Sequence, residues 1–210
     1  LPDPEVPRGR RIAEFDDGMR TIIVQGPERV AIVGANGTGK TTFIESLVNR
    51  TPPPAGLPVQ LPRGELHVDL VGYLSQHLDG LDDARDAVAN VRDVAPEVDP
   101  GTIRNRLARM LLRGDSVYRP VGTLSGGERF RVALARLLLA DPPAQLLVLD
   151  EPTNNLDITS VEQLAEALDA YRGALIVVSH DFGFLRRIGI DTVVELTGDG
   201  GLRQRVGLED

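Results

Sequence analysis

The sequence predicts an α/β fold with a mainly parallel sheet, and three observations support this prediction. Apolar strand-like runs alternate with segments of helical periodicity along most of the 210 residues, as expected for a parallel sheet covered by helices. One strand-like run, 29–33, leads directly into a glycine-rich loop and a helical segment. The stretch from about 78 to 123 is helical and more charged, which predicts a small helical subdomain inserted into the core.

The N-terminal part is predicted to be a linker followed by antiparallel strands. Residues 1–10 are rich in proline and glycine and are expected to form a leader without regular structure. Residues 12–15 and 21–24 have strand character on either side of an Asp17-Gly18 turn, which predicts a hairpin. One folded domain is therefore expected over 11–210.

The middle of the chain is predicted to alternate between helix, loop and strand. After the glycine-rich loop, apolar residues at helical spacing predict a helix that ends near Asn49. The proline-rich residues 51–64 are expected to be loop. Alternating residues 66–70 predict a half-buried strand, and 71–74 follow as another strand-like run. A long helix is expected to begin at Ser125 and to end near residue 140.

Apolar runs dominate the C-terminal third. Residues 146–149 form a continuous apolar stretch, typical of a strand buried on both faces. A helix is expected over 161–171, a second buried strand over 174–178, and a last strand over 191–196. The remaining tail is rich in glycine.

Composition excludes several classes of protein. The formal net charge of −8 argues against an extended nucleic-acid-binding surface on this chain alone. The absence of cysteine excludes disulfides and thiolate metal sites. No apolar run approaches the roughly 20 residues that span a bilayer, and no secretory signal is present, so we expect a cytoplasmic protein without membrane insertion. Because the chain begins with Leu1 rather than Met, it is expected to be part of a longer protein.

The glycine-rich loop fits the phosphate-binding pattern G-x-x-x-x-G-K-[ST]. Glycines let the backbone turn so that successive N–H groups point at phosphate oxygens, and the following helix adds its free N-terminal donors. The lysine can reach the terminal phosphates, and the hydroxyl of Thr41 can bind Mg²⁺. The predicted nucleotide-binding residues are Gly34, Ala35, Asn36, Gly37, Thr38, Gly39, Lys40, Thr41 and Thr42.

Lys40 is the only lysine in the chain; every other strongly basic side chain is arginine. A compact ammonium fits among phosphates where a planar guanidinium does not. The alternative, a glycine-rich turn that contains a lysine by chance, explains neither the flanking strand and helix nor this composition.

Four polar residues follow predicted strands. Asp150 is suited to bind the Mg²⁺ of a nucleotide, and Glu151 is suited to deprotonate an attacking water. Gln76 can reach the same metal and water, and His180 can contact the terminal phosphate. Each of these residues alone is more often a solvated or structural residue. Together with the phosphate-binding loop, they predict a catalytic site at the carboxyl edge of the sheet.

The run Leu124-Ser125-Gly126-Gly127-Glu128 opens the long helix in an unusual way. Ser125 and Glu128 have the spacing of a capping box. Two adjacent glycines weaken a first helical turn, so a capped helix alone does not account for them. They are expected where an anion approaches the free N–H groups closely.

In this order, the motifs resemble those of an ATP-binding-cassette (ABC) nucleotide-binding domain, a P-loop NTPase, from end to end. The resemblance implies an ATPase with Glu151, His180 and Gln76 as catalytic residues and Thr41, Gln76 and Asp150 as metal ligands. It assigns Ser125, Gly126, Gly127 and Glu128 to the signature, which acts on the nucleotide of a facing cassette, and Asn155-Leu156-Asp157 to the D-loop. It also places Phe15 near the family's adenine-stacking aromatic residue, although a core phenylalanine is the simpler reading.

Continuous stretches around the signature and the Asp150 strand are similar to the soluble ABC-F subfamily, and the short subdomain is similar to its second cassette. Asn155 departs from the histidine usual there. The resemblance implies ATP and Mg²⁺ as cofactors, pairing with a second cassette, and action on the ribosome in translation or antibiotic resistance. The ATPase subunit of a membrane transporter remains an alternative. A chromosome-maintenance or DNA-repair clamp is a third, but no long coiled-coil insertion is present.

Overall fold

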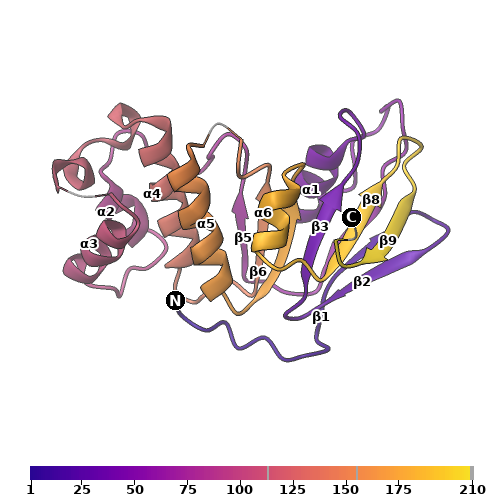
Figure 1. Ribbon diagram of the computed structural model, residues 1–210, viewed down its shortest axis with the longest axis horizontal. Coiled ribbons are helices and arrows are strands. Elements are labelled where there is room, and N and C mark those ends of the chain that lie inside the picture. The colour runs from indigo at the N-terminus through magenta and orange to yellow at the C-terminus, as the bar shows by residue number, and fades with distance from the viewer. Residues whose placement is uncertain (113, 155, 209–210) are drawn as a thin grey trace.

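A computed structural model describes residues 1–112, 114–154 and 156–208 (Figure 1). The core is a six-stranded sheet in the order β5-β6-β7-β3-β8-β9, beside a three-stranded antiparallel sheet in the order β2-β1-β4. The helical subdomain lies beyond β5, at the end of the molecule opposite β9 (Figure 1). The predicted α/β class, the antiparallel N-terminal part and the inserted helical subdomain are all confirmed.

The six-stranded sheet is parallel except at one edge, because only β9 runs antiparallel to its neighbour. Strands β6 and β7 are buried along their whole length, as their uninterrupted apolar sequences predict. The strands are β3 (Arg29–Val33), β5 (Val71–Leu74), β6 (Leu146–Asp150), β7 (Ala174–Val178), β8 (Thr192–Leu196) and β9 (Leu202–Val206).

The antiparallel sheet confirms the predicted hairpin but corrects one strand. It consists of β1 (Arg11–Asp16), β2 (Thr21–Gln25) and β4 (Arg63–Leu66). The strand predicted over 66–70 is wrong, since β4 ends at Leu66. Only one further backbone hydrogen bond, from the N–H of His67 to the carbonyl of Ile12, continues that ladder. The bounds of this strand are therefore set by its pairing with β1. The alternation of polar and apolar side chains over 66–70 does not predict them.

The helices lie close to the predicted positions. Pro100 begins a helix rather than interrupting one, as its fixed φ allows at a first helical position. Two elements were not predicted: β9 in the glycine-rich tail and the short helix α6. The helices are α1 (Lys40–Val48), α2 (Ala87–Arg92), α3 (Pro100–Arg109), α4 (Gly126–Leu138), α5 (Ile158–Ala170) and α6 (Phe182–Arg187), with 3-10 turns η1 (Gly114–Tyr118) and η2 (Val121–Thr123).

Apolar side chains cover both faces of the large sheet. On one face they pack against α1 and the antiparallel sheet. On the other face they pack against α4, α5 and α6. A third cluster fills the helical subdomain, and α4 contributes to it as well, for example through Val132 and Leu139. Helix α4 therefore joins the subdomain to the core.

Arg29, at the start of β3, connects the ends of two helices. Its guanidinium donates to the carbonyl oxygens of Leu168 (2.8 Å) and Tyr171 (3.1 Å) at the end of α5, and to that of Ile188 after α6. These carbonyls lie in or just after the last turn of each helix, where carbonyls lack the usual i+4 donor, and that of Leu168 also accepts from the N–H of Tyr171 (3.2 Å). The cation also interacts favourably with the negative ends of both helix dipoles.

We expect R29M to lower the free energy of unfolding by about 3 kcal/mol, since a half-buried charged donor is lost and the carbonyls remain. For a chain of this size, that corresponds to a decrease in Tm of roughly 6–12 °C. R20M is the matched control, because Arg20 is exposed and its ion pair with Asp17 is long at 3.9 Å. Thermal unfolding of both variants checks this, and equal Tm values would contradict it.

Candidate functional site

The phosphate-binding loop connects β3 to α1 at the carboxyl edge of the sheet. Two of its glycines are required by the backbone. A side chain at Gly34 would meet the carbonyl oxygen of Leu196 at 2.4 Å, and Gly39, with φ 90°, is in the left-handed region. No side chain caps α1, so the first N–H groups of this helix are free to bind an anion.

Lys40 is held inside the loop. Its Nζ donates to the carbonyl oxygens of Gly34 (2.9 Å) and Ala35 (3.0 Å), and the side chain is only 8% exposed. Burial lowers the pKa of Lys40, while the carboxylates of Glu151 and Asp150 oppose that shift. The ammonium is therefore already oriented and partly desolvated within the loop, which strengthens its interaction with a phosphate oxygen.

An open cavity of about 820 Å³ lies in front of the loop and brings together residues from four separate stretches. Ten residues line it: Asn36, Gly37, Gly39, Lys40, Thr41, Thr42, Gln76, Glu151, Asn154 and His180. Most of the predicted nucleotide-binding and catalytic residues are thus neighbours. Gly34, Ala35 and Thr38 shape the loop instead; Thr38 is buried and donates to the carbonyl of Ala35 (3.0 Å).

Glu151 and His180 lie next to each other in the lining of this cavity. Nε2 of His180 lies 3.3 Å from Oε1 of Glu151. Burial raises the pKa of Glu151, and the charges of His180 and Lys40 oppose the shift. Glu151 also has φ 46°, a strained conformation for a non-glycine residue that its N–H bond to the carbonyl of Val178 (2.8 Å) helps to maintain. A partly buried carboxylate with an elevated pKa is suited to act as a general base.

Asp150 ends β6 and is almost completely buried, with 1% exposed. Neither of its carboxylate oxygens has a hydrogen-bond partner within the described residues. Burial raises its pKa, and the Thr41 hydroxyl and the Lys40 ammonium oppose this. Asp150 lines a smaller cavity of about 200 Å³ together with Glu151 and Gln76. A buried carboxylate without a donor, beside hydroxyl and amide oxygens, fits a hard divalent cation.

The predicted capping box at the start of α4 is confirmed. Oγ of Ser125 donates to the Glu128 carboxylate (2.9 Å), which also accepts from the N–H of Ser125 (2.9 Å) and from Ser116 (2.8 Å). These hydrogen bonds lower the pKa of Glu128. Gly126 is exposed, and a side chain there would meet no atom within 4 Å. The first turn of α4 is therefore open to solvent, and none of residues 125–128 lines the 820 Å³ cavity.

Asp157 caps α5 by accepting from the N–H of Ser160 (2.7 Å). It lies next to the start of α4, since a side chain at Gly127 would be 3.7 Å from its Oδ2. Arg131 of α4 donates to Oγ of Ser160 (3.1 Å), which fixes the two helix starts relative to each other. Asn155, which stands where the family resemblance leads us to expect a histidine, lies outside the described residues.

The model of the ABC transporter family matches residues 20–154 of this chain. That range contains the phosphate-binding loop, the Gln76 loop, the start of α4 and the Asp150-Glu151 strand end. The chain belongs to the ABC transporter family. Its members contain ATP-binding cassettes that hydrolyse ATP, and this chain is such a cassette.

Several similar proteins are named as ABC-F proteins. ABC transporter F family member 2 of Arabidopsis thaliana is 36% identical over 198 residues, which are 92% of this chain and 28% of that protein. ATP-binding cassette sub-family F member 3 of Mus musculus is 37% identical over 162 residues, 76% of this chain and 22% of that protein. The cassette therefore spans only about a quarter of the length of these relatives.

Solved ABC structures share the fold. A bacterial Atm1-family ABC exporter with ATP bound superposes with a TM-score of 0.73 at 21% identity, over 97% of this chain and 41% of the exporter chain. The dimeric bacterial ABC transporter cassette MJ0796 gives 0.71 at 20% identity, over 93% of this chain and 98% of that one. No helix in the described part of our cassette is long and apolar enough to cross a membrane.

One predicted site residue of the cassette is wrong. Phe15 is completely buried and packs edge-on against Phe43, with ring centroids 5.2 Å apart, so it cannot stack on an adenine base. Its position on an inward-facing side of β1 explains this. Conversely, Asn154 lines the cavity but was not predicted as a site residue. Its place three residues after Glu151, in a loop that follows a catalytic strand, was the signal available in the sequence.

Proposed function

We propose that this cassette belongs to an ABC-F protein that acts on the ribosome, in translation or in resistance to antibiotics, through ATP-driven pairing of two cassettes. The observation that carries the proposal is the cavity in which Lys40, Glu151 and His180 meet. The similarity to proteins named as ABC-F members supports the subfamily.

In the proposed reaction, the phosphates of ATP lie in the 820 Å³ cavity against the start of α1. Lys40 binds the terminal phosphates with the ammonium that the loop already orients. Glu151 accepts a proton from the attacking water, and His180, 3.3 Å away, orients that carboxylate and contacts the γ-phosphate. Each step uses a side chain that lines the same cavity.

Mg²⁺ is the proposed metal, and the residues fit it. Asp150 supplies buried oxygens that no described residue bonds by hydrogen-bond geometry, while Thr41 and Gln76 supply a hydroxyl and an amide oxygen. When bound, Mg²⁺ would neutralise charge on the phosphates. Gln76 lines both cavities, so it is suited to contact both the metal and the water.

A second cassette, in the same polypeptide or as a second copy of this one, is proposed to complete the site. The exposed first turn of α4 offers Ser125 and Gly127 for the γ-phosphate of a facing cassette. None of residues 125–128 lines the 820 Å³ cavity of its own chain, and only Gly126 borders the smaller cavity beside Asp150. Two large apolar side chains are exposed next to catalytic segments: Ile158 (80%) follows Asp157, and Phe182 (52%) follows the His180 segment. Exposed apolar groups at this rim favour a protein interface.

We expect the kcat of ATP hydrolysis to decrease at acidic pH. A general base acts only when deprotonated, and burial raises the pKa of Glu151 above its ordinary value of 4.5. The rate therefore decreases as the pH falls through this raised pKa, and the negative charge of bound phosphates raises the pKa further. Steady-state rates between pH 4.5 and 8, with circular dichroism to confirm folding, check this. A hydrolysis rate that does not change with pH over that whole range would contradict the role of Glu151.

Cosedimentation tests the ribosomal part of the proposal. The full-length protein carrying E151Q is mixed with ribosomes in the presence of ATP and centrifuged. We expect it to pellet with ribosomes, and we expect a K40M variant, which binds ATP poorly, to remain in the supernatant. Absence of both variants from the ribosome pellet, combined with copurification of a membrane subunit, would instead favour the transporter alternative.

A further inference from the structure

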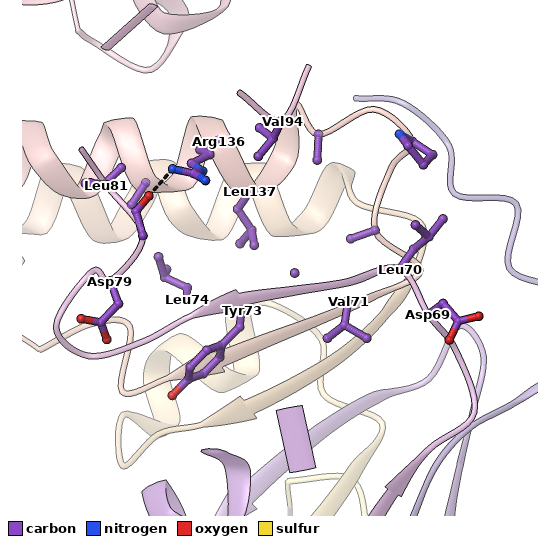
Figure 2. A pocket seen from close by; sticks show the side chains of 16 residues that line it. Asp69, Leu70, Val71, Tyr73, Leu74, Asp79, Leu81, Val94, Arg136 and Leu137 are labelled. Atoms are coloured by element: carbon purple, nitrogen blue, oxygen red, sulfur yellow. Dashed lines mark hydrogen bonds between the residues drawn. The ribbon is translucent and has the colours of Figure 1, made fainter. Parts of the chain in front are cut away.

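Tyr73 lies on β5, next to the acidic end of β6. The register between the two strands pairs Tyr73 with Val148, and Val148 shares a face with Asp150 because side chains alternate along a strand. Figure 2 shows Tyr73 extending from β5 on the side opposite Leu137 and Arg136. Its ring packs against the apolar layer between the sheet and α1.

The Tyr73 hydroxyl and the Asp150 carboxylate are complementary but unpaired. Within the described residues, the Oη atom of Tyr73 and both oxygens of Asp150 are buried without a hydrogen-bond partner. Burial, followed by the charge of Asp150, raises the pKa of Tyr73, so the phenol stays protonated and can donate. A phenylalanine would fill the same volume without a buried unsatisfied hydroxyl. The hydroxyl is therefore available to donate to an acceptor that comes within reach when ligands bind.

Two further acidic groups raise the pKa of Tyr73, but both are weaker candidates for its acceptor. Glu45 of α1 is exposed. Asp79 already accepts from Oγ of Ser75 at 2.7 Å. Among the described acidic residues near Tyr73, Asp150 is the buried one. Neither of its oxygens meets hydrogen-bond geometry with a described donor, although the Thr41 hydroxyl is close enough to lower its pKa.

We propose that Tyr73 is a positioning residue for Asp150. When nucleotide and metal bind, its O–H donates to one Asp150 oxygen, directly or through one water, so that the other oxygen faces the cation. This inference depends on the proposed metal-binding role of Asp150. It assigns Tyr73 to orientation of the carboxylate, not to contact with ATP.

The test is Y73F, with two measurements on the purified chain: Tm without nucleotide, and ATP affinity with and without Mg²⁺. We expect an unchanged or higher Tm, because an unsatisfied hydroxyl is removed. We expect the factor by which Mg²⁺ strengthens ATP binding to decrease at least about tenfold, as for loss of one hydrogen bond to a charged group. ATP affinity without Mg²⁺ stays unchanged.

Y171F is the matched control. The Tyr171 hydroxyl is also buried, but it donates to the carbonyl of Ala144 at 2.8 Å and lies away from the cavity. We expect Y171F to lower Tm and to leave the Mg²⁺ factor unchanged. If Y73F behaves like Y171F, Tyr73 is only structural and the inference is overturned.

D150N separates this inference from the function on which it depends. We expect D150N to lose most of the Mg²⁺ factor, and we expect Y73F to have no further effect in that background. If D150N loses the factor while Y73F matches the wild type, the role of Tyr73 is wrong and the metal site stands. If Y73F lowers the Mg²⁺ factor equally with and without D150N, the role of Tyr73 is also wrong. If the wild type shows no Mg²⁺ factor, both proposals are wrong.

Discussion

The E151Q variant is expected to bind ATP normally, to hydrolyse it at least about 100-fold more slowly than the wild type, and to accumulate as an ATP-bound pair. Glutamine keeps the shape of the side chain but cannot accept a proton from water, and general-base catalysis contributes a factor of about 10²–10⁴. Removing the negative charge also reduces repulsion between this position and the γ-phosphate. Size-exclusion chromatography with light scattering, in ATP and Mg²⁺, measures the pairing, and a phosphate-release assay measures hydrolysis.

E162Q is the control for this experiment. Glu162 lies on α5, is half-exposed, and makes a long ion pair of 3.8 Å with Arg187. We expect its hydrolysis rate and its oligomeric state to match the wild type. A monomeric E151Q variant that still binds ATP would contradict the proposed pairing, and a fully active one would contradict the assignment of the general base.

Substitution of Lys40 is expected to have the second large effect. K40M removes a buried, oriented ammonium, and loss of a charged hydrogen bond of about 2–3 kcal/mol weakens ATP binding by roughly 30–150-fold. K40R keeps the charge, but its planar guanidinium does not fit the two carbonyl oxygens of the loop in the same way. We therefore expect K40R to bind ATP at least about tenfold more weakly than the wild type.

The single lysine permits a direct measurement of this role. An amine-reactive reagent can modify only Lys40 and the N-terminal amine in this chain. We expect ATP to slow modification of Lys40, followed by mass spectrometry, while the N-terminal amine reacts at the same rate with and without ATP. Equal protection of both amines, or wild-type affinity of K40M, would show that the phosphates bind elsewhere.

The sequence predicts those parts of the fold whose signal is local. Strands β6 and β7 are uninterrupted apolar runs, and α4 begins at a capping box, so both kinds of element were predicted within a few residues. The strand expected over 66–70 failed because its boundaries depend on pairing with β1, which lies about 50 residues earlier in the chain. Strand β9 was missed because its residues 203–206 are exposed and only Leu202 is buried.

The site was predictable to the extent that its residues follow strands of one parallel sheet. Lys40, Gln76, Glu151 and His180 each come after such a strand, and parallel strands end at a common edge, so their meeting in one cavity follows from the fold. The assignment of Phe15 to adenine stacking was wrong because the side chain faces the core, which is the simpler reading of an aromatic residue in an apolar strand. The burial of Asp150 beside an unpaired phenol depends on strand register and could not be predicted.

A structure of the E151Q variant with ATP and Mg²⁺ tests the central claim most directly. The account predicts a triphosphate in the cavity beside α1, with Lys40 bound to its terminal phosphates, Asp150 at the cation, and the α4 start of a second cassette against the γ-phosphate. A cavity without nucleotide at saturating ATP, or a γ-phosphate approached by the α4 start of the same chain, would contradict it.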